Sequence, residues 1–429
     1  MTTIAYLANE FPSPVEPYVK EEIAELERRG NEVITGSVRK RRFSHGSAGT
    51  PKPQIVLQFF SLTLLLQAVF LCARKWMRIA PLLFRILIRG GEGLLQRIKA
   101  LAHTFLGACY AVRLRGRDVE HIHVHHGYFG SWVAMTAARL MDISFSMTLH
   151  GSDLLLHPAY LDVKLAACKF CLTVSDYNRD YILAQYPQIS GEKIIVSRMG
   201  VDVSAICALQ PAKRDDGYRL KLLAVGRLHP VKDHAFLIRA CAQLVVVGVE
   251  FECSIAGEGP ERSSLENLIV ECGLGQLVTL LGHIDSAQLG PMYDAADVVA
   301  LTSRSEGIPL VLMEAMAHGK IVIAPAITGI PELVIPGKTG FLYEPGSMSD
   351  FLSQLLFIRS MIFAAKSAQS GSSNSADATL DWIRHAARVQ VLQNFNRTNN
   401  LQYFADLFLK RISSQREQMP HENLVLQQI

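Results

Sequence analysis

The sequence predicts an α/β fold of two domains, each built on a parallel sheet. The length of 429 residues is sufficient for two or three domains with large cores. Near the N-terminus, an apolar run at 4–8, a helical pattern at 16–29, Gly30 and a second apolar run at 32–38 follow the order of a strand–helix–strand unit. A similar series begins near residue 219. We therefore expect two Rossmann-like domains that face each other across a cleft.

Further apolar runs of strand length alternate with helical stretches in both halves. They lie at 120–125, 145–149, 170–174, 220–225, 251–256, 278–281, 298–301 and 321–324. We expect residues 1–209 to form the first domain and 219–385 the second, with the polar segment 210–218 between them. Residues 386–412 are predicted to be helices that pack back toward the first domain, and 413–429 a mobile tail.

Composition indicates a globular chain, with 49% apolar and 19% charged residues and a net charge of +4. This balance says little about partners, and we expect no nucleic-acid partner. The eight cysteines are scattered in apolar runs, as in reduced proteins of the cytosol. Cys168 and Cys171 form a CxxC without a second pair, so a metal or redox site is not favoured there. The N-terminus lacks the basic region of a signal peptide, which leads us to expect a cytoplasmic protein.

Residues 54–117 interrupt the alternation. The apolar stretch 55–73 has about the length of a membrane span, but polar side chains within it weaken that interpretation. Residues 74–117 contain ten Lys or Arg and one acid, Glu92, and Pro81 should prevent one unbroken helix. Apolar and basic side chains together favour contact with an anionic membrane surface, which would place the protein peripherally at the inner face of the plasma membrane. A buried helical insertion with a solvated face is the other interpretation.

A glycine and two cations follow the predicted strand at 220–225. Gly226 would let a ligand approach the backbone, while Arg227 and Lys232 could meet a diphosphate. A solvent-exposed loop would have the same composition. Gly257 and Gly259, in a Gly-Glu-Gly-Pro loop after another strand, would also permit close approach to a nucleotide, but such loops are common.

Residues 303–315 contain the strongest motif. Glu306 lies in the loop after a strand, and Glu314 lies two turns into the helix that follows. Carboxylates bind sugar hydroxyls well, and the helix N-terminus suits a phosphate. Two glutamates at this spacing could instead lie on a solvated face. However, Glu314 is surrounded by apolar residues, where a carboxylate should be paired or functional.

Together these motifs resemble those of the retaining family-4 glycosyltransferases of the GT-B fold. The glutamates at 306 and 314 match that family's spacing, and Gly329-Ile330-Pro331-Glu332 follows in the expected order. The match covers most of residues 120–345. The segment Phe11-Pro12-Ser13-Pro14 is similar to members that build bacterial exopolysaccharides. The resemblance implies transfer of a sugar from a nucleotide sugar to a lipid-linked or saccharide acceptor.

The resemblance also implies a role for individual residues. Arg227 and Lys232 would grip the donor diphosphate, Glu306 would face the donor sugar and Glu314 would hold the ribose. The remaining donor-binding candidates are Gly226, Gly257, Gly259, Gly307, Ile308 and Pro309.

The N-terminal half contributes His150 and Asp153, in a segment similar to the family's His-Gly-x-Asp. His150 would reach the reacting sugar, and Asp153 and Glu10 are candidates on the acceptor side. The alternating histidines at 121, 123 and 125 share one strand face, and a metal site is not favoured there because no carboxylate pattern accompanies them. The family often has His-x-His at this strand, so the resemblance implies a packing or cleft-lining role. Met199 stands where the family more often has Asn.

No Asp-x-Asp follows a strand, so we expect neither a metal nor a cofactor. The resemblance implies front-face transfer with retention of configuration. Three alternatives remain open at this point: a sugar-nucleotide epimerase of the same fold, a non-catalytic protein that binds nucleotide sugars, and a membrane-interaction protein built around residues 54–117.

Overall fold

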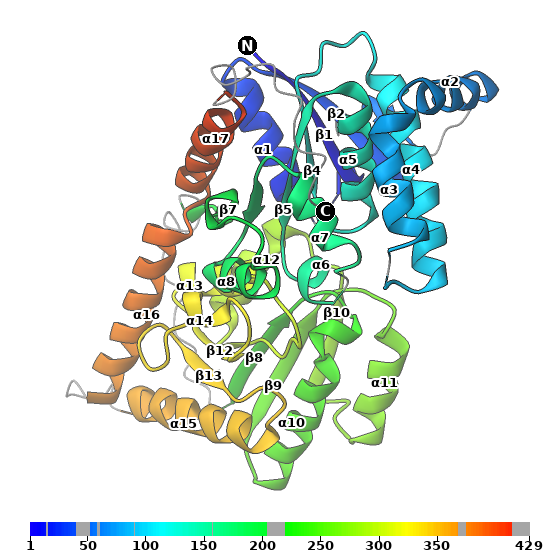
Figure 1. Cartoon of the computed structure of the whole chain (residues 1–429). Coiled ribbons are helices and arrows are strands. Elements are labelled where there is room, and N and C mark those ends of the chain that lie inside the picture. The colour runs from blue at the N-terminus through cyan, green and yellow to red at the C-terminus, as the bar shows by residue number, and fades with distance from the viewer. Residues whose placement is uncertain are drawn as a thin grey trace.

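The computed structural model describes residues 1–13, 16–39, 52–57, 61–89, 91–156, 158–203, 219–367 and 375–413. Two parallel sheets occupy opposite halves of the molecule, and helices pack on both (Figure 1). The segment 210–218, expected between the domains, and the tail from 414 onward lie outside the described residues.

The first sheet contains seven strands among the described residues, in the order β3-β2-β1-β4-β5-β6-β7. Every neighbouring pair is parallel. The strands are β1 (Thr3–Glu10), β2 (Glu32–Arg39), β3 (Ile55–Val56), β4 (His121–His125), β5 (Ser144–Leu149), β6 (Cys171–Thr173) and β7 (Ile194–Val196). The strand order reverses between β1 and β4, which is where ligands bind in sheets of this kind.

The second sheet contains six described strands, in the order β10-β9-β8-β11-β12-β13, and all of its neighbouring pairs are parallel. They are β8 (Leu220–Val225), β9 (Phe251–Ala256), β10 (Val278–Gly282), β11 (Val298–Ala300), β12 (Ile321–Pro325) and β13 (Phe341–Tyr343). Its order reverses between β8 and β11. The predicted α/β architecture of two Rossmann-like sheets is thus confirmed.

Helices cover both sheets because the strands of a parallel sheet are buried on both faces. Those that position the site are α1 (Pro17–Arg28), α5 (Phe129–Met141), α6 (Ser152–Leu155), α7 (Leu161–Ala167), α8 (Asp176–Gln185), α10 (His234–Val246), α11 (Arg262–Glu271), α12 (Ser286–Ala295), α13 (Leu310–Ala317) and α14 (Ile330–Leu333). Short turns lie at η1 (Gly191–Lys193) and η2 (Pro230–Lys232).

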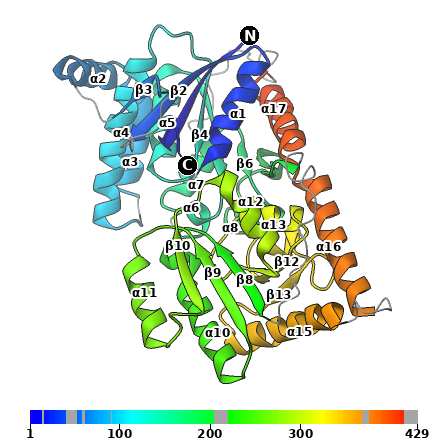
Figure 2. The same ribbon diagram turned by 180° about the vertical axis from the view of Figure 1, so that it is seen from behind.

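The region 54–117 folds as β3 and three helices, α2 (Leu62–Arg74), α3 (Trp76–Leu87) and α4 (Leu94–Leu114), at the outer edge of the first half (Figure 2). The apolar stretch 55–73 is divided between β3 and a 13-residue helix, which is too short to span a bilayer. Contrary to expectation, Pro81 does not break the helix in which it lies. It lies inside α3 on an exposed side, where water can reach the carbonyl that loses its partner.

Among the described helices, one is long and apolar enough to cross a membrane by length and composition, through the window Met348–Ala365 in α15 (Met348–Ser367). Length and composition are weak evidence, since core helices pass the same test. Phe351, Leu355 and Ile358 of α15 are fully buried in the core of the second sheet, so one face of this helix packs against that sheet.

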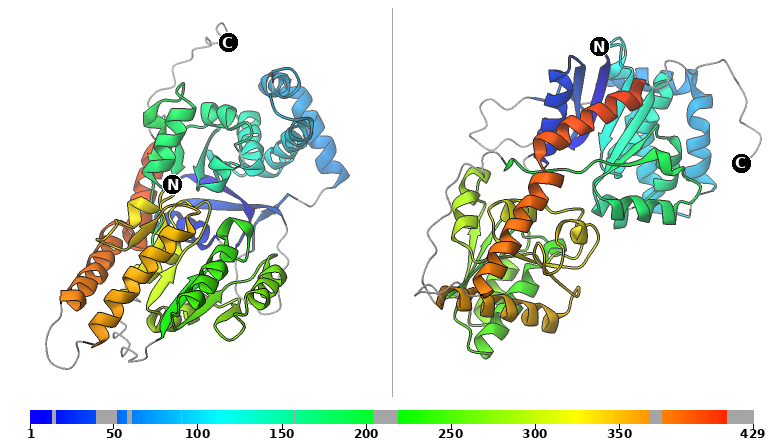
Figure 3. Two further views of the ribbon diagram at one scale, coloured as in Figure 1. Left: turned by 90° about the horizontal axis from the view of Figure 1, so that it is seen from below. Right: turned by 90° about the vertical axis from the view of Figure 1, so that its left-hand side faces the viewer.

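Two C-terminal helices connect the halves of the molecule. The first, α16 (Ser375–Asn394), buries Ala387 and Val391 against the second sheet. The second, α17 (Arg397–Ser413), packs Phe404 and Phe408 into a core that also contains Tyr6. Figure 3 shows these helices running along one side of the molecule, from the second sheet to the first.

Candidate active site

The carboxyl ends of the two sheets meet backbone to backbone. A Cβ atom placed on Gly307, in the loop after β11, would lie 2.3 Å from the carbonyl oxygen of His150, which follows β5. A Cβ on Gly151 would lie 3.1 Å from the backbone nitrogen of Gly307. The structure therefore brings together two predicted site segments that are more than 150 residues apart in the sequence.

The predicted residues Lys232 and Glu306 form an ion pair at this junction. Lys232 Nζ donates to Glu306 Oε1 at 2.5 Å, and the two side chains are 19% and 11% exposed. The backbone of Glu306 is also fixed, because Thr328 Oγ1 donates to its carbonyl at 2.6 Å. The pair is thus firmly placed at the rim of the second sheet, with both charges close to the surface.

Arg227 is exposed at the carboxyl end of β8, and no hydrogen bond or ion pair joins its guanidinium to another described residue. Its positive charge acts across the junction on the pKa of Glu16, the residue before α1. Burial pushes the pKa of Glu16 upward, but His126 and the more distant charges of His125 and Arg227 bring it below the ordinary value. The guanidinium is therefore available to an anion between the two sheets.

Glu314 lies further along α13, away from the ion pair. It accepts a hydrogen bond from Tyr293 Oη at 2.7 Å. Burial raises its pKa, against the hydrogen bond to Tyr293 and the charges of His318 and Arg397, which lower it. No described hydrogen bond connects Glu314 with Glu306, so the two predicted glutamates have separate surroundings.

The two glycines after β9 have a packing role that the sequence did not predict. A Cβ on Gly257, whose φ is +153°, would lie 1.9 Å from the carbonyl oxygen of Gly226. A Cβ on Gly259 would lie 2.2 Å from the carbonyl oxygen of Leu228. Close packing of one loop against the next thus requires glycine at both positions, and it places Arg227 at the end of β8.

The other predicted donor-binding residues expose little side chain, since Ile308 and Pro309 are buried and Gly226 has none. The side chain of Ile308 is 3% exposed and belongs to the core beneath α13. Pro309 has extended φ and ψ angles and is the residue at which α13 begins. Gly226 lies at the end of β8, with Lys232 Cδ 3.7 Å from the position that a Cβ would take.

His150 is half-buried at the end of β5. Its Nε2 lies 2.9 Å from His125 Nδ1, and its ring centroid is 4.8 Å from that of Tyr18. Asn178 Nδ2 donates to its carbonyl oxygen at 3.2 Å. Burial above all lowers the pKa of His150 well below the ordinary value, so its ring is neutral at physiological pH.

Asp153 is fully buried and holds the His150 loop. Its carboxylate accepts hydrogen bonds from the backbone nitrogens of Gly127 at 2.8 Å, Gly151 at 2.8 Å and His150 at 3.1 Å. Burial opposes its ionisation, yet His126 and these amides bring its pKa far below the ordinary value. This position favours support of the loop over the acceptor contact that we expected.

Glu10, the other candidate on the acceptor side, is half-buried at the carboxyl end of β1, opposite Arg39 in the sheet register. No contact joins it to His150 in the described part of the chain.

The histidines on β4 divide into two groups. His121 and His123 are buried between hydroxyl groups of Ser144, Ser146 and Thr148, in the packing role that the family resemblance favoured. His125 instead reaches both His150 and Glu22 of α1.

The ligand atoms of Glu22, His123 and His125 lie within 4.8 Å of one another. Each already has hydrogen-bonding partners in the protein, so the cluster is satisfied without a cation.

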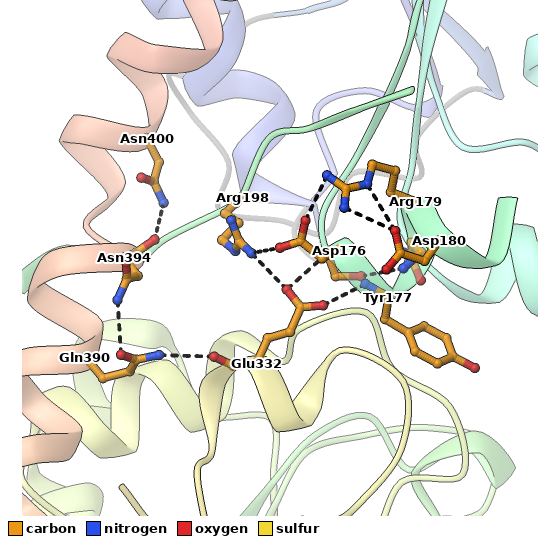
Figure 4. Close-up of polar contacts among 11 residues, drawn as sticks. Asp176, Tyr177, Arg179, Asp180, Arg198, Glu332, Gln390, Asn394 and Asn400 are labelled. Carbon is orange, nitrogen blue, oxygen red and sulfur yellow. Dashed lines mark hydrogen bonds and ion pairs between the residues drawn. The ribbon is translucent and has the colours of Figure 1, made fainter. Parts of the chain in front are cut away.

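A polar clasp between the two halves involves a motif residue to which the sequence assigned no role. Glu332 of α14 accepts hydrogen bonds from the backbone nitrogens of Asp176 at 3.1 Å and Tyr177 at 2.8 Å, at the start of α8 (Figure 4). Arg198 donates to the same carboxylate at 3.0 Å, and Gln390 of α16 donates to the Glu332 carbonyl. The second half thus caps a helix of the first.

Residues 210–360 match the family model described as glycosyl transferases group 1. A putative colanic acid biosynthesis glycosyltransferase, WcaL of Salmonella typhimurium, is 36% identical over 212 residues, or 48% of each chain. The chain therefore spans about half the length of the curated relatives that it matches.

Solved structures agree with the fold along nearly the whole chain. A glycosyltransferase from Rickettsia africae superposes with a TM-score of 0.65 and 18% identity, covering 96% of this chain and 99% of its own. HepE of Anabaena, in complex with UDP and glucose, superposes with a TM-score of 0.66 and 19% identity, covering 96% and 100%. The predicted GT-B fold is confirmed by these likenesses.

Proposed function

We propose that this protein is a retaining glycosyltransferase of the hexosyltransferase type, with the nucleotide-sugar donor at the second sheet and the acceptor on the side of the first. The observation that carries the proposal is the meeting of the Lys232–Glu306 pair with the His150 loop, through the contact of Gly307 with the His150 carbonyl. Cations, a sugar-binding carboxylate and a neutral imidazole thus converge where two parallel sheets present their carboxyl ends. In this account, residues 1–209 are the acceptor domain and residues 219–385 the donor domain.

The donor diphosphate would lie between Arg227 and Lys232, near the N-terminus of α13. As the bond between the sugar C1 and the phosphate oxygen breaks, negative charge grows on the phosphate, and two cations and a helix dipole stabilise it. The acceptor oxygen attacks C1 from the same face and passes its proton to the departing phosphate. Glu306 and His150 hydrogen-bond the sugar hydroxyls meanwhile, and Glu314 holds the ribose.

No step of this mechanism requires a metal or a cofactor. The cations of Arg227 and Lys232 supply the charge that a divalent ion supplies in other transferases. This independence from metal is part of the proposal and is tested by assaying transfer in the presence of a chelator.

We propose a lipid-linked oligosaccharide or polysaccharide precursor as the acceptor. The similarity to the putative colanic acid transferase supports this choice. So does an apolar surface on the helices α2, α3 and α4. Its exposed side chains are Leu62, Leu66, Val69, Phe70, Trp76, Met77, Phe84, Leu87, Ile88, Leu94, Leu95 and Ile98.

That surface suits peripheral binding to an anionic membrane on the cytoplasmic side. Arg74, Arg78, Arg89 and Lys99 are exposed among the apolar side chains, and such a mixture binds acidic headgroups. Arg85 of α3 lies over the Tyr160 ring at 5.1 Å, which ties this surface to the segment after α6, on the side of the His150 loop. A lipid-borne acceptor could thus reach the site while its anchor stays in the bilayer.

Screening nucleotide sugars for thermal stabilisation, beginning with uridine diphosphate sugars because HepE binds UDP, tests the proposal. The selected donor is then incubated with and without saccharide and lipid-linked acceptors, and the products are analysed for linkage and anomeric configuration. We expect acceptor-dependent transfer with retention. An altered sugar nucleotide formed without acceptor would show an epimerase instead, and stabilisation without turnover a binding protein.

A further inference from the structure

A buried chain of side chains leads from α1 to the predicted catalytic histidine. Glu22 Oε2 lies 3.0 Å from His125 Nε2, and His125 Nδ1 lies 2.9 Å from His150 Nε2. Tyr6 Oη contacts both Glu22 and His125 Nε2. His125 is fully buried and Glu22 is 8% exposed, so water does not compete for these hydrogen bonds.

We propose that Glu22 and His125 are positioning residues that hold His150 in the tautomer with the proton on Nε2 and a bare Nδ1. This inference rests on the proposed function for its catalytic meaning, but the tautomer itself is a property of the free protein.

The assignment follows from which atom donates and which accepts in each hydrogen bond between Glu22 and His150. An ionised Glu22 can only accept hydrogen bonds. It therefore accepts one from the Tyr6 hydroxyl and one from His125 Nε2–H. With His125 neutral, its Nδ1 is bare and accepts from the next donor. That donor is His150 Nε2–H, and the neutral His150 ring is left with Nδ1 as an acceptor.

The bare Nδ1 is the atom of His150 that remains for a substrate. No hydrogen bond joins it to another group in the described ranges. A ring nitrogen without a proton accepts from a sugar hydroxyl, whereas the opposite tautomer would present a donor there. The chain from Glu22 therefore decides which kind of hydrogen bond His150 makes across the junction.

Nitrogen-15 NMR of the ring nitrogens in histidine-labelled protein, at about pH 8 where free histidine is neutral, reads the tautomer directly. We expect the Nε2–H form of His150 in the wild type and loss of this preference in Glu22→Gln, because the new amide can donate to His125 Nε2. Glu25→Gln on the same helix is the matched control, since Glu25 pairs with Arg28 and Arg29 instead. A wild-type His150 with its proton on Nδ1, or an unchanged pattern in Glu22→Gln, would overturn the inference, and the wild-type spectrum decides even if the variant does not fold.

Enzyme kinetics provide a second test of the positioning role. Glu22→Gln should lower kcat at least about tenfold with little change in the KM for the donor. In a His150→Gln background it should add nothing further, because Glu22 acts through His150. Additive losses would contradict the relay, whereas absence of transfer in the wild type would contradict the proposed function and leave the NMR result standing.

Discussion

The carbonyl oxygen of His150 lies against the α-carbon of Gly307, so that the two sheets touch where no side chain separates them. A methyl group at Gly307 would lie 2.3 Å from that oxygen and 2.9 Å from Val174 Cγ2. Because the nearest atom is a backbone oxygen, which cannot turn away as a side chain can, one sheet must move relative to the other to remove the clash.

Gly307→Ala should therefore reduce kcat/KM at least about tenfold and lower the unfolding free energy by about 1–3 kcal/mol, the usual cost of overpacking. Gly275→Ala is the control, since its Cβ would meet nothing within 4 Å and its φ is not positive. Steady-state kinetics and urea unfolding measure both effects. Normal turnover in Gly307→Ala would show that the contact is not needed for catalysis.

The clasp at Glu332 makes a prediction about local opening. Glu332→Gln removes the charge that Arg198 and the two amides at the start of α8 share. Hydrogen exchange of the Tyr177 amide should accelerate at least about tenfold, with a loss of about 1–2 kcal/mol in stability, as for other helix caps. Glu344→Gln, at an exposed glutamate of the same domain, should change neither. Unaltered exchange at Tyr177 would mean that the clasp does not restrain the two halves.

His126 should make stability depend on alkaline pH. Burial lowers its pKa, but the Asp153 carboxylate, 3.6 Å from Nδ1, and the Glu16 carboxylate, hydrogen-bonded to Nε2 at 2.8 Å, outweigh this and raise the pKa to about 10. A pKa above the unfolded value of about 6.5 means that the stabilisation is complete below about pH 6.5 and is lost as pH rises through about 10. The variant His126→Asn tolerates the positive φ of 70° and removes the titration.

Urea unfolding of the wild type and His126→Asn should thus give a large difference in unfolding free energy at about pH 7 and a much smaller one at about pH 10. Groups that His126 does not touch titrate alike in both proteins, so the pH dependence of the difference reports His126 together with its carboxylate partners Glu16 and Asp153. A difference that stays constant over this range would refute the raised pKa.

The apolar surface on α2–α4 predicts binding to anionic membranes. Replacing Phe84, Ile88 and Leu95 together with Ser should weaken sedimentation with phosphatidylglycerol-containing vesicles at least about tenfold, because each side chain is at least 46% exposed and would be buried in the bilayer. Val246→Ser with Val270→Ser, at exposed positions of the second domain, is the control. Wild-type binding should also fall with added salt. Equal binding to neutral vesicles would contradict the preference for anionic headgroups, and no binding at all would contradict a membrane role.

Sequence patterns were sufficient for ten of the thirteen described strands, because buried parallel strands are continuous apolar runs. The short strands β3, β7 and β13 were missed, since runs of two or three residues carry too little pattern. The patterns also placed Lys232 and Glu306 at strand ends, which converge. They could not show whether a glycine is needed for close approach of a ligand or for close packing of another loop, because only the tertiary structure shows the neighbour. Gly257, which packs against the loop after β8, is an example. Glu22 was missed for a similar reason. A glutamate on a helix indicates a solvated face until the partner strand, here with His125, is known.

The central claim is that Arg227 and Lys232 bind the donor diphosphate while Glu306 binds its sugar. Calorimetric titration of the wild type, Arg227→Ala and Glu306→Gln, with the selected nucleotide sugar and with its nucleoside diphosphate alone, tests this claim most directly. Lys338→Ala, at an exposed lysine remote from the pair, is the control.

We expect Arg227→Ala to weaken both ligands at least about tenfold. Glu306→Gln should weaken only the nucleotide sugar, and it should leave the diphosphate unchanged or bound more tightly, because Lys232 is released from its ion pair. Equal affinities of all three proteins for both ligands would contradict the account.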